Sequence, residues 1–179
     1  MLQRPLTGEP LCLDLVNTRW IEGGLPKDLL DEPGGAEEWI AEHGYDPGAS
    51  EGLRETRDAL RTVLELGEPA PLNAVLAWGS CTPVLTADGP AEVAAIEPGR
   101  RVAWDAARDY LRLLAAVPER IRRCAHPACV LWFHDTSRNG TRRWCSMEAC
   151  GNRAKAGRYY RRTHQSRAGG EQAQTSGID

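Results

Sequence analysis

Four of the six cysteines in this 179-residue chain form two pairs with equal spacing. Four residues separate the members of each pair, and fifteen residues separate the two pairs. A short loop can place two thiolates on one tetrahedral ion, and two such loops complete a closed four-sulfur site. Such a site holds zinc for structure, because catalytic zinc keeps a position open for water. The spacing therefore predicts one structural Zn²⁺ bound by Cys124, Cys129, Cys145 and Cys150.

Other chemistry is open to the same residues. Disulfides or an iron–sulfur cluster would also use four cysteines, and zinc release on oxidation would make the site a redox sensor. His126 and His134 lie close enough in the sequence to replace a ligand, but two complete cysteine pairs make them unnecessary. The other cysteines, Cys12 and Cys81, stand alone among apolar residues, so we expect both to be buried.

Basic residues gather around the second cysteine pair and after it. At about 100° per residue, a helix that follows Cys150 would bring Lys155 and the later arginines onto one broad arc. Arginine forks onto phosphates and onto guanine edges. The predicted DNA-contacting residues are Arg138, Arg142, Arg143, Arg153, Lys155, Arg158, Arg161 and Arg162. The alternatives are docking of these cations on an acidic protein surface and simple solvation.

The net charge of −3 hides an uneven distribution. Residues 1–119 contain 10 Lys and Arg against 21 Asp and Glu, whereas residues 120–179 contain 12 against 4. A basic segment beside an acidic body is expected where one part of a chain meets a polyanion. The same asymmetry keeps open the alternative that the basic part docks on the acidic part.

The beginning of the sequence gives an expectation about location. It has no sustained apolar run followed by a small-residue cleavage site, and no stretch is long enough to span a bilayer. We expect a cytoplasmic protein without a membrane partner. Thiols stay reduced in that compartment, which favours metal binding over disulfides.

The elements around the cysteines resemble a small zinc finger. Residues 130–133 form an apolar strand, Asn139-Gly140 predicts a tight turn, and residues 141–144 would supply the return strand. A helix is expected from the second cysteine pair to about His164. Knuckle, hairpin and helix in this order predict a treble-clef-like finger over residues 119–166, followed by a disordered tail over residues 167–179.

The N-terminal section, residues 1–118, is predicted to be mainly helical with one small hairpin, which makes the chain α+β. Residues 11–16 fit a strand or a helix almost equally well. Ser50 is the expected N-cap of a solvated helix with i,i+4 pairs such as Arg54 with Asp58. Further predicted elements are helices at 36–43, 72–79 and 101–117, and a hairpin at 82–87 and 91–96 around Asp88-Gly89.

Two polar residues lie within the densest apolar run of the N-terminal section. Asp14 and Asn17 are expected to be partly buried and therefore to need hydrogen-bond partners. Local turn and capping bonds would satisfy them, and the alternative is a pocket for a small-molecule effector. No phosphate loop, nucleophile elbow or supported acid pair is visible, so we expect no enzyme activity.

The run from Cys124 to Arg162 resembles the CGNR zinc-finger family, named for the tetrad present here as residues 150–153. Residues 133–139 and 142–147 carry the rest of the match, although His134 stands where an apolar residue is expected. The N-terminal section resembles the ABATE domain that precedes this finger, most clearly at residues 13–18, Leu-Asp-Leu-Val-Asn-Thr.

This resemblance implies a bacterial, stress-induced transcription regulator whose finger binds DNA. We therefore expect a DNA-binding regulator with an N-terminal domain that senses a small-molecule or protein effector. The rivals are a zinc-stabilised protein-interaction module without direct DNA binding and an enzyme with a site in the N-terminal section. Nothing in the sequence indicates the oligomeric state.

Overall fold

The computed structural model describes residues 3–155 and shows helices mixed with small antiparallel hairpins, as predicted. The helices are α1 (Leu11–Val16), α2 (Gly35–Glu42), α3 (Leu53–Leu66), α4 (Ala70–Leu76) and α5 (Arg101–Ala116). The strand pairs are β1 (Arg19–Glu22) with β2 (Leu25–Asp28), β3 (Gly79–Thr86) with β4 (Gly89–Ile96), and β5 (Ile121–Arg123) with β6 (Trp132–His134). Short helical turns lie at Leu29–Asp31, Pro118–Arg120 and Met147–Gly151. Within residues 3–155, no helix is both long and apolar enough to cross a membrane.

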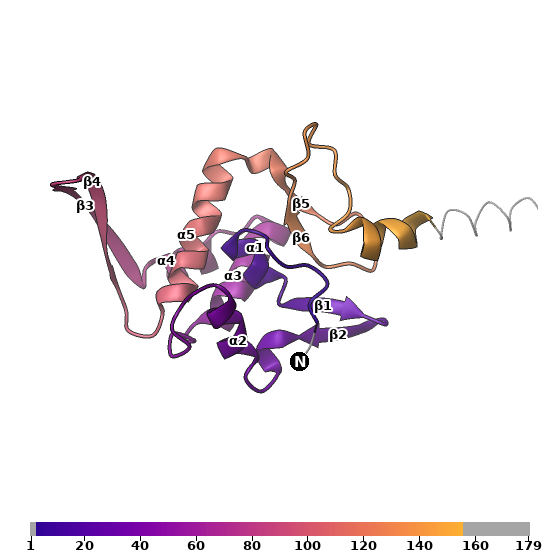
Figure 1. Ribbon diagram of the computed structural model, residues 1–179, viewed down its shortest axis with the longest axis horizontal. Helices are drawn as coiled ribbons and strands as arrows, with labels where there is room; N and C mark the ends of the chain where they lie inside the picture. The colour runs from indigo at the N-terminus through magenta and orange to yellow at the C-terminus, as the bar shows by residue number, and fades with distance from the viewer. Residues whose placement is uncertain (1–2, 156–179) are drawn as a thin grey trace, which may run out of the picture.

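Helix α1 is the centre of the N-terminal part, where it packs against α3 and α5 (Figure 1). Every residue from Cys12 to Val16 is buried. A helix covered on all sides has no polar stripe, so its apolar pattern cannot be told from that of a strand by periodicity. Of the two possibilities for residues 11–16, the strand is therefore wrong.

Helix α3 begins at Leu53 after Gly52, so the prediction of Ser50 as its N-cap is wrong. Gly52 has a φ of 76°, and a Cβ at this position would come within 2.7 Å of the Trp78 ring. Both the left-handed backbone and the close ring favour glycine. At the other end, Gly67 caps the helix with a φ of 73°.

A second hairpin, β1–β2, was not predicted from the sequence. Glu22 pairs with Leu25, so Gly23 and Gly24 form a two-residue turn, and their φ angles are 59° and 83°. A turn with both central residues at positive φ is the type that Gly-Gly dipeptides favour. The signal was therefore present in the sequence, although the flanking strands are only four residues long.

The predicted hairpin around Asp88-Gly89 is confirmed as β3–β4, which projects from the body beside α4 and α5 (Figure 1). An ion pair between Arg108 on α5 and Glu92 on β4, 2.8 Å long, ties it to the helices. Cys12 is fully buried as expected. Cys81 on β3 is only half-buried, because most residues of this projecting hairpin are exposed.

The strand pairing of the C-terminal part differs from the prediction. Strand β6 pairs with β5, which precedes the first cysteine pair, and not with residues 141–144. Phe133 lies opposite Arg122 in this register. The turn at Asn139-Gly140 does exist, since Gly140 N donates to Ser137 O at 3.1 Å. It belongs to a loop with no strand beyond it in the part of the chain described, and the predicted return strand is wrong.

Candidate metal centre and its basic surface

The four predicted ligands meet at one buried point. All four sulfur atoms lie within 4.8 Å of one another, with 3.8 Å between Cys129 and Cys145 and 3.6 Å between Cys145 and Cys150. A regular tetrahedron with Zn–S bonds of about 2.3 Å has edges of about 3.8 Å. Disulfide sulfurs are about 2.05 Å apart, so these thiols are free. The four cysteines therefore form one closed site for a structural Zn²⁺.

The closeness of the thiols shifts their pKa values in opposite directions. Hydrogen bonds from Cys129 and Cys145 lower the pKa of Cys124, because neighbouring S–H groups stabilise its thiolate. Those same contacts with Cys124 raise the pKa of Cys145 and bring that of Cys129 to about 12. A divalent ion would hold all four as thiolates, since its charge offsets their mutual repulsion.

The turn between β5 and β6 positions the first cysteine pair. Cys124 N donates to Leu131 O at 2.9 Å, which closes the strand pair at its end. Cys129 N donates to His126 O, also at 2.9 Å. His126 accepts a bond from Ala128 N and plays no part in the sulfur cluster. The first pair thus sits in the hairpin turn itself.

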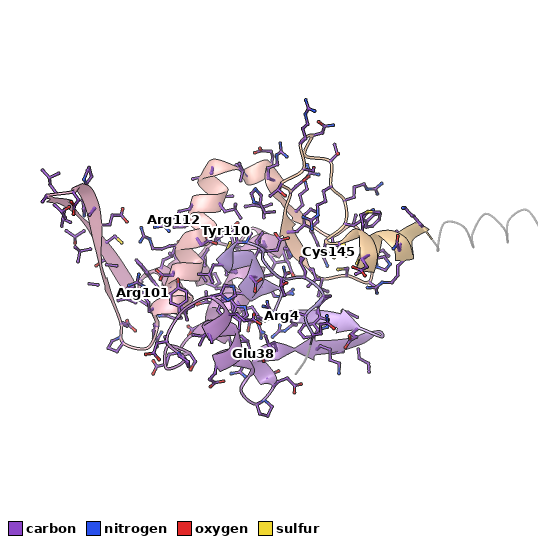
Figure 2. All side chains as sticks on the ribbon, in the orientation of Figure 1. Arg4, Glu38, Arg101, Tyr110, Arg112 and Cys145 are labelled. Atoms are coloured by element: carbon purple, nitrogen blue, oxygen red, sulfur yellow. The ribbon has the colours of Figure 1, made fainter. Side chains whose placement is uncertain are left out.

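A tight helical turn positions the second pair. The Ser146 side chain caps it by accepting from Ala149 N at 2.9 Å, and Cys150 N donates to Ser146 O. A Cβ at Gly151 would come within 2.7 Å of the Met147 sulfur, so only glycine fits here without a shift. Figure 2 shows Cys145 where this turn meets the rest of the finger.

Asp135 organises the loop between the cysteine pairs. It is 1% exposed, and its carboxylate accepts from the Ser137 backbone N, the Ser137 hydroxyl and Arg142 N. The hydrogen bonds from Ser137 hold the pKa of Asp135 below its usual range. Arg122 adds a charge 3.6 Å away. Asp135 was not singled out from the sequence, although Asp followed two residues later by Ser is a common turn signal.

Arg142 was predicted to contact DNA, but its guanidinium makes hydrogen bonds and a ring contact within the finger. Its guanidinium donates to the carbonyls of Trp144 and Cys145 and lies 4.4 Å from the centre of the Phe133 ring. Glu9 of the N-terminal part lies 3.8 Å from it. These contacts hold the loop that carries Cys145, so Arg142 supports the metal site.

Several other predicted cations are exposed. Arg138, Arg143, Arg153 and Lys155 all face solvent, and Arg143 lies 5.3 Å above the Trp144 ring. The ion pairs of the described finger residues involve other arginines, namely Arg120, Arg122 and Arg142. The predicted contacts Arg158, Arg161 and Arg162 lie outside the described residues.

The finger is held to the N-terminal part by hydrogen bonds to its backbone. Asn17 bonds both the N–H and the carbonyl of Trp132 on β6, at 3.0 and 2.8 Å. Glu9 accepts from His134 N at 2.7 Å, on the same strand. Sequence reasoning singled out Asn17 but could not assign its partner, which lies 115 residues away.

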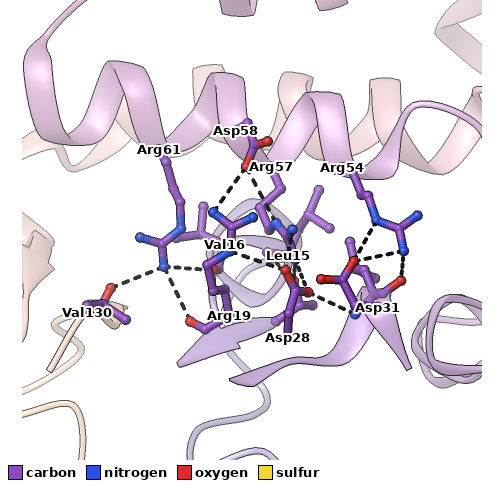
Figure 3. A network of polar contacts seen from close by, with 12 residues as sticks. Leu15, Val16, Arg19, Asp28, Asp31, Arg54, Arg57, Asp58, Arg61 and Val130 are labelled. Carbon is purple, nitrogen blue, oxygen red and sulfur yellow. Dashed lines mark hydrogen bonds and ion pairs between the residues drawn. The ribbon is translucent and has the colours of Figure 1, made fainter. Parts of the chain in front are cut away.

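An arginine-rich network on α3 reaches the same boundary (Figure 3). Arg57 is 1% exposed and forks onto Asp28 of β2 at 2.5 and 2.7 Å. Arg61, one turn further along, donates to Val130 O of the finger at 3.4 Å. The expected pair of Arg54 with Asp58 does not form, because Arg54 instead pairs with Asp31. This face of α3 is thus an internal contact and not the solvated surface that its charges suggested.

Asp14, the second candidate for a ligand pocket, also has partners within the chain. Its carboxylate accepts from Arg4, from Trp39 Nε1 at 2.8 Å and from Gly8 N at 3.1 Å. Arg4 lies over α1 near the middle of the molecule in Figure 2. These bonds tie the N-terminal segment to α1 and α2. The prediction that Asp14 and Asn17 line an effector pocket gains no support from these contacts.

Two family models match the chain. Residues 120–163 match the family model described as CGNR zinc finger. Residues 9–117 match the model of the ABATE domain, described as "Putative stress-induced transcription regulator". A search of the curated proteins finds no match. The ABATE match covers more than half of the chain. The chain therefore belongs to the ABATE family, here joined to a CGNR zinc finger.

Proposed function

We propose that the protein is a transcription regulator that binds DNA through its zinc finger. The observation that carries this proposal is that the finger's arginines fall into two groups, one bonded within the finger and one exposed. Arg120 and Arg142 bond to backbone carbonyls of the finger, whereas Arg138 and Arg143 present their charges to solvent. An exposed cationic surface on a rigid metal-held platform is suited to phosphate contacts.

The exposed cations would act on the DNA backbone. Lys and Arg displace counterions from phosphates, so affinity falls as salt concentration rises. Phosphate contacts orient a protein on the duplex without reading its sequence. The chain beyond Lys155 adds Arg158, Arg161 and Arg162 to the positive charge. In this proposal the finger has the treble-clef arrangement.

The N-terminal part would regulate the finger through their shared boundary. Strand β6 of the finger packs against α1, and Arg61 of α3 donates to Val130 O just before that strand. A small-molecule or protein effector that shifts α1 or α3 would therefore move the platform that carries the cations. The acidic body would also repel DNA from every face except that of the finger.

The proposal is tested by titrating a short fluorescent duplex of mixed sequence with the zinc-loaded full chain at several salt concentrations. We expect log K to fall linearly with log salt, by about 0.9 per phosphate contact. A triple Ala variant at Arg138, Arg143 and Lys155 should bind more weakly with a shallower slope. A matched triple Ala variant at Arg54, Arg101 and Arg112 removes the same charge from the body and should bind almost as tightly as the wild type, with an unchanged slope.

The outcome also separates the rival function. An interaction module that docks on acidic proteins would show no duplex binding even at low salt, and this result would overturn the proposal. Equal loss of affinity in both triple variants would show that net charge, and not the finger's surface, drives binding.

A further inference from the structure

The surface of the finger contains a hollow that the proposed function does not yet use. It has a volume of about 370 Å³, near the lower end of the range of roughly 300–1,000 Å³ for small-ligand sites. Its lining combines two hydroxyl side chains, two arginines and two large apolar groups: Ser137, Thr141, Arg142, Arg143, Trp144 and Met147. None of these lining residues is acidic.

The apolar part of the hollow is formed by Trp144 and Met147. These side chains come together over Gly151, where a Cβ would lie 2.7 Å from the Met147 sulfur and 3.5 Å from Trp144 Cδ1. Met147 is 53% exposed. A half-exposed thioether beside an indole and an exposed guanidinium offers a flat apolar contact to a planar ligand.

The polar part carries positive charge at a fixed position. Arg143 is exposed and stacks 5.3 Å from the centre of the Trp144 ring. Arg142 forms a rigid wall because its guanidinium is bonded to the carbonyls of Trp144 and Cys145. An apolar contact for a planar ring next to an exposed guanidinium combines the two groups that hold a nucleotide: a stacking surface for its base and a cation for its phosphate.

We propose that this hollow receives one unpaired nucleobase of DNA, stacked against Trp144 and Met147, with the adjoining phosphate on Arg143. The proposal rests on the proposed function, since it concerns the same finger and the same ligand class. A base inside an intact duplex cannot present its flat face to a side chain, because both faces are stacked on neighbouring pairs. The finger should therefore prefer DNA with an unpaired or displaced base over a perfect duplex.

The experiment compares three fluorescent DNAs with the zinc-loaded full chain: a perfect duplex, the same duplex with one central bulged base, and the single strand. We expect the bulged duplex and the single strand to bind about tenfold more tightly than the perfect duplex, which is the size of one base–aromatic stacking contact. Met147→Ala should shrink this preference, and Trp144→Ala should abolish it.

Because Trp144 also packs against the finger's core, its Ala variant could lose structure. Trp144→Tyr keeps a stacking ring and should retain most of the preference, and zinc content measured on each variant reports folding. Leu66→Ala, which alters another exposed apolar side chain, on α3, should leave the preference intact. Equal affinity for bulged and perfect duplexes would overturn this inference and leave the proposed function standing. No binding to any of the three DNAs would overturn both.

Discussion

Asn17 and Trp132 are joined by two hydrogen bonds, from Asn17 Nδ2 to Trp132 O at 2.8 Å and from Trp132 N to Asn17 Oδ1 at 3.0 Å. Strand β6 has β5 on one edge, and the amide of Asn17 bonds its backbone in the way that a neighbouring strand would. Asn17 itself is fully buried at the end of α1. The amide of Asn17 therefore connects the finger to the N-terminal part by satisfying both backbone groups of Trp132.

Replacement of Asn17 should loosen the finger from the body. Asn17→Ala leaves a buried N–H and a carbonyl of Trp132 without partners, which costs about 1–3 kcal/mol of unfolding free energy. Asn17→Asp should be as harmful, because a carboxylate cannot donate to Trp132 O. Urea unfolding measures the loss, with Asn73→Ala on the exposed side of α4 as the control. Wild-type stability in both Asn17 variants would show that this link is dispensable.

Removal of the metal should also destabilise the N-terminal part. Phe133 of β6 is fully buried, and β6 contacts α1. Zinc binding supplies on the order of 10 kcal/mol to the folding of small fingers. We expect one zinc per chain, and partial unfolding when a strong chelator removes it. Cys150→Ser should lose the metal, whereas Cys81→Ser on the projecting hairpin should keep it. If the unfolding free energy and the amide hydrogen-exchange protection of α1 stayed at their zinc-loaded values after chelation, the coupling between the metal site and the N-terminal part would be contradicted.

The metal site could be predicted from the sequence because its chemistry is local. Two thiols five positions apart can bind one ion through a single short loop, and two such pairs complete the set of four ligands. The partner of β6 could not be found in this way. Asn139-Gly140 is a strong turn signal, yet the pairing is decided by β5, which lies before the first cysteine pair.

The burial of charged residues could not be predicted either. Arg57 sits on α3 among alternating acids and arginines, and nothing in that pattern sets it apart from its exposed neighbours. Its burial depends on Asp28, which lies 29 residues earlier in a hairpin that was not predicted. The strongest local patterns, those of α3 and α5, were predicted well, while contacts between distant segments were not.

The pair of Arg57 and Asp28 makes stability depend on pH in acid. Burial alone would raise the pKa of Asp28, but the hydrogen bonds and charge of Arg57 outweigh it and hold the pKa below its usual range. A lowered folded-state pKa means that the stabilisation is fully present above the unfolded pKa of about 3.9 and disappears as pH falls through the folded value.

The corresponding variant is Asp28→Asn. It removes the nearer counter-ion of the buried Arg57 guanidinium and leaves only Asp58, 3.8 Å away, so we expect a loss of about 1–3 kcal/mol near neutral pH. Unfolding free energies measured from neutral pH down to below the unfolded pKa should converge between wild type and variant in acid. A constant difference at every pH would mean that Asp28 is not the titrating partner. Asp88→Asn in the exposed turn of β3–β4 is the control.

Arg142 and Arg143 are adjacent in the sequence but should behave as opposites. Arg142 bonds two backbone carbonyls beside Cys145 and stacks on Phe133. Arg142→Ala should therefore lower the unfolding free energy by about 1–3 kcal/mol and make zinc easier to remove. Arg143 is exposed, so Arg143→Ala should change stability by no more than about 0.5 kcal/mol.

DNA affinity separates the same two residues. Arg143→Ala should weaken binding and reduce the salt slope by about 0.9, the amount expected for one phosphate contact. Arg142→Lys keeps the charge but cannot fork onto two carbonyls. The Lys variant should therefore lose zinc as easily as Arg142→Ala does. If Arg142→Ala instead retained zinc and stability and lost only DNA binding, then Arg142 would be a DNA contact after all. Its internal hydrogen bonds would then be those of the unbound finger alone.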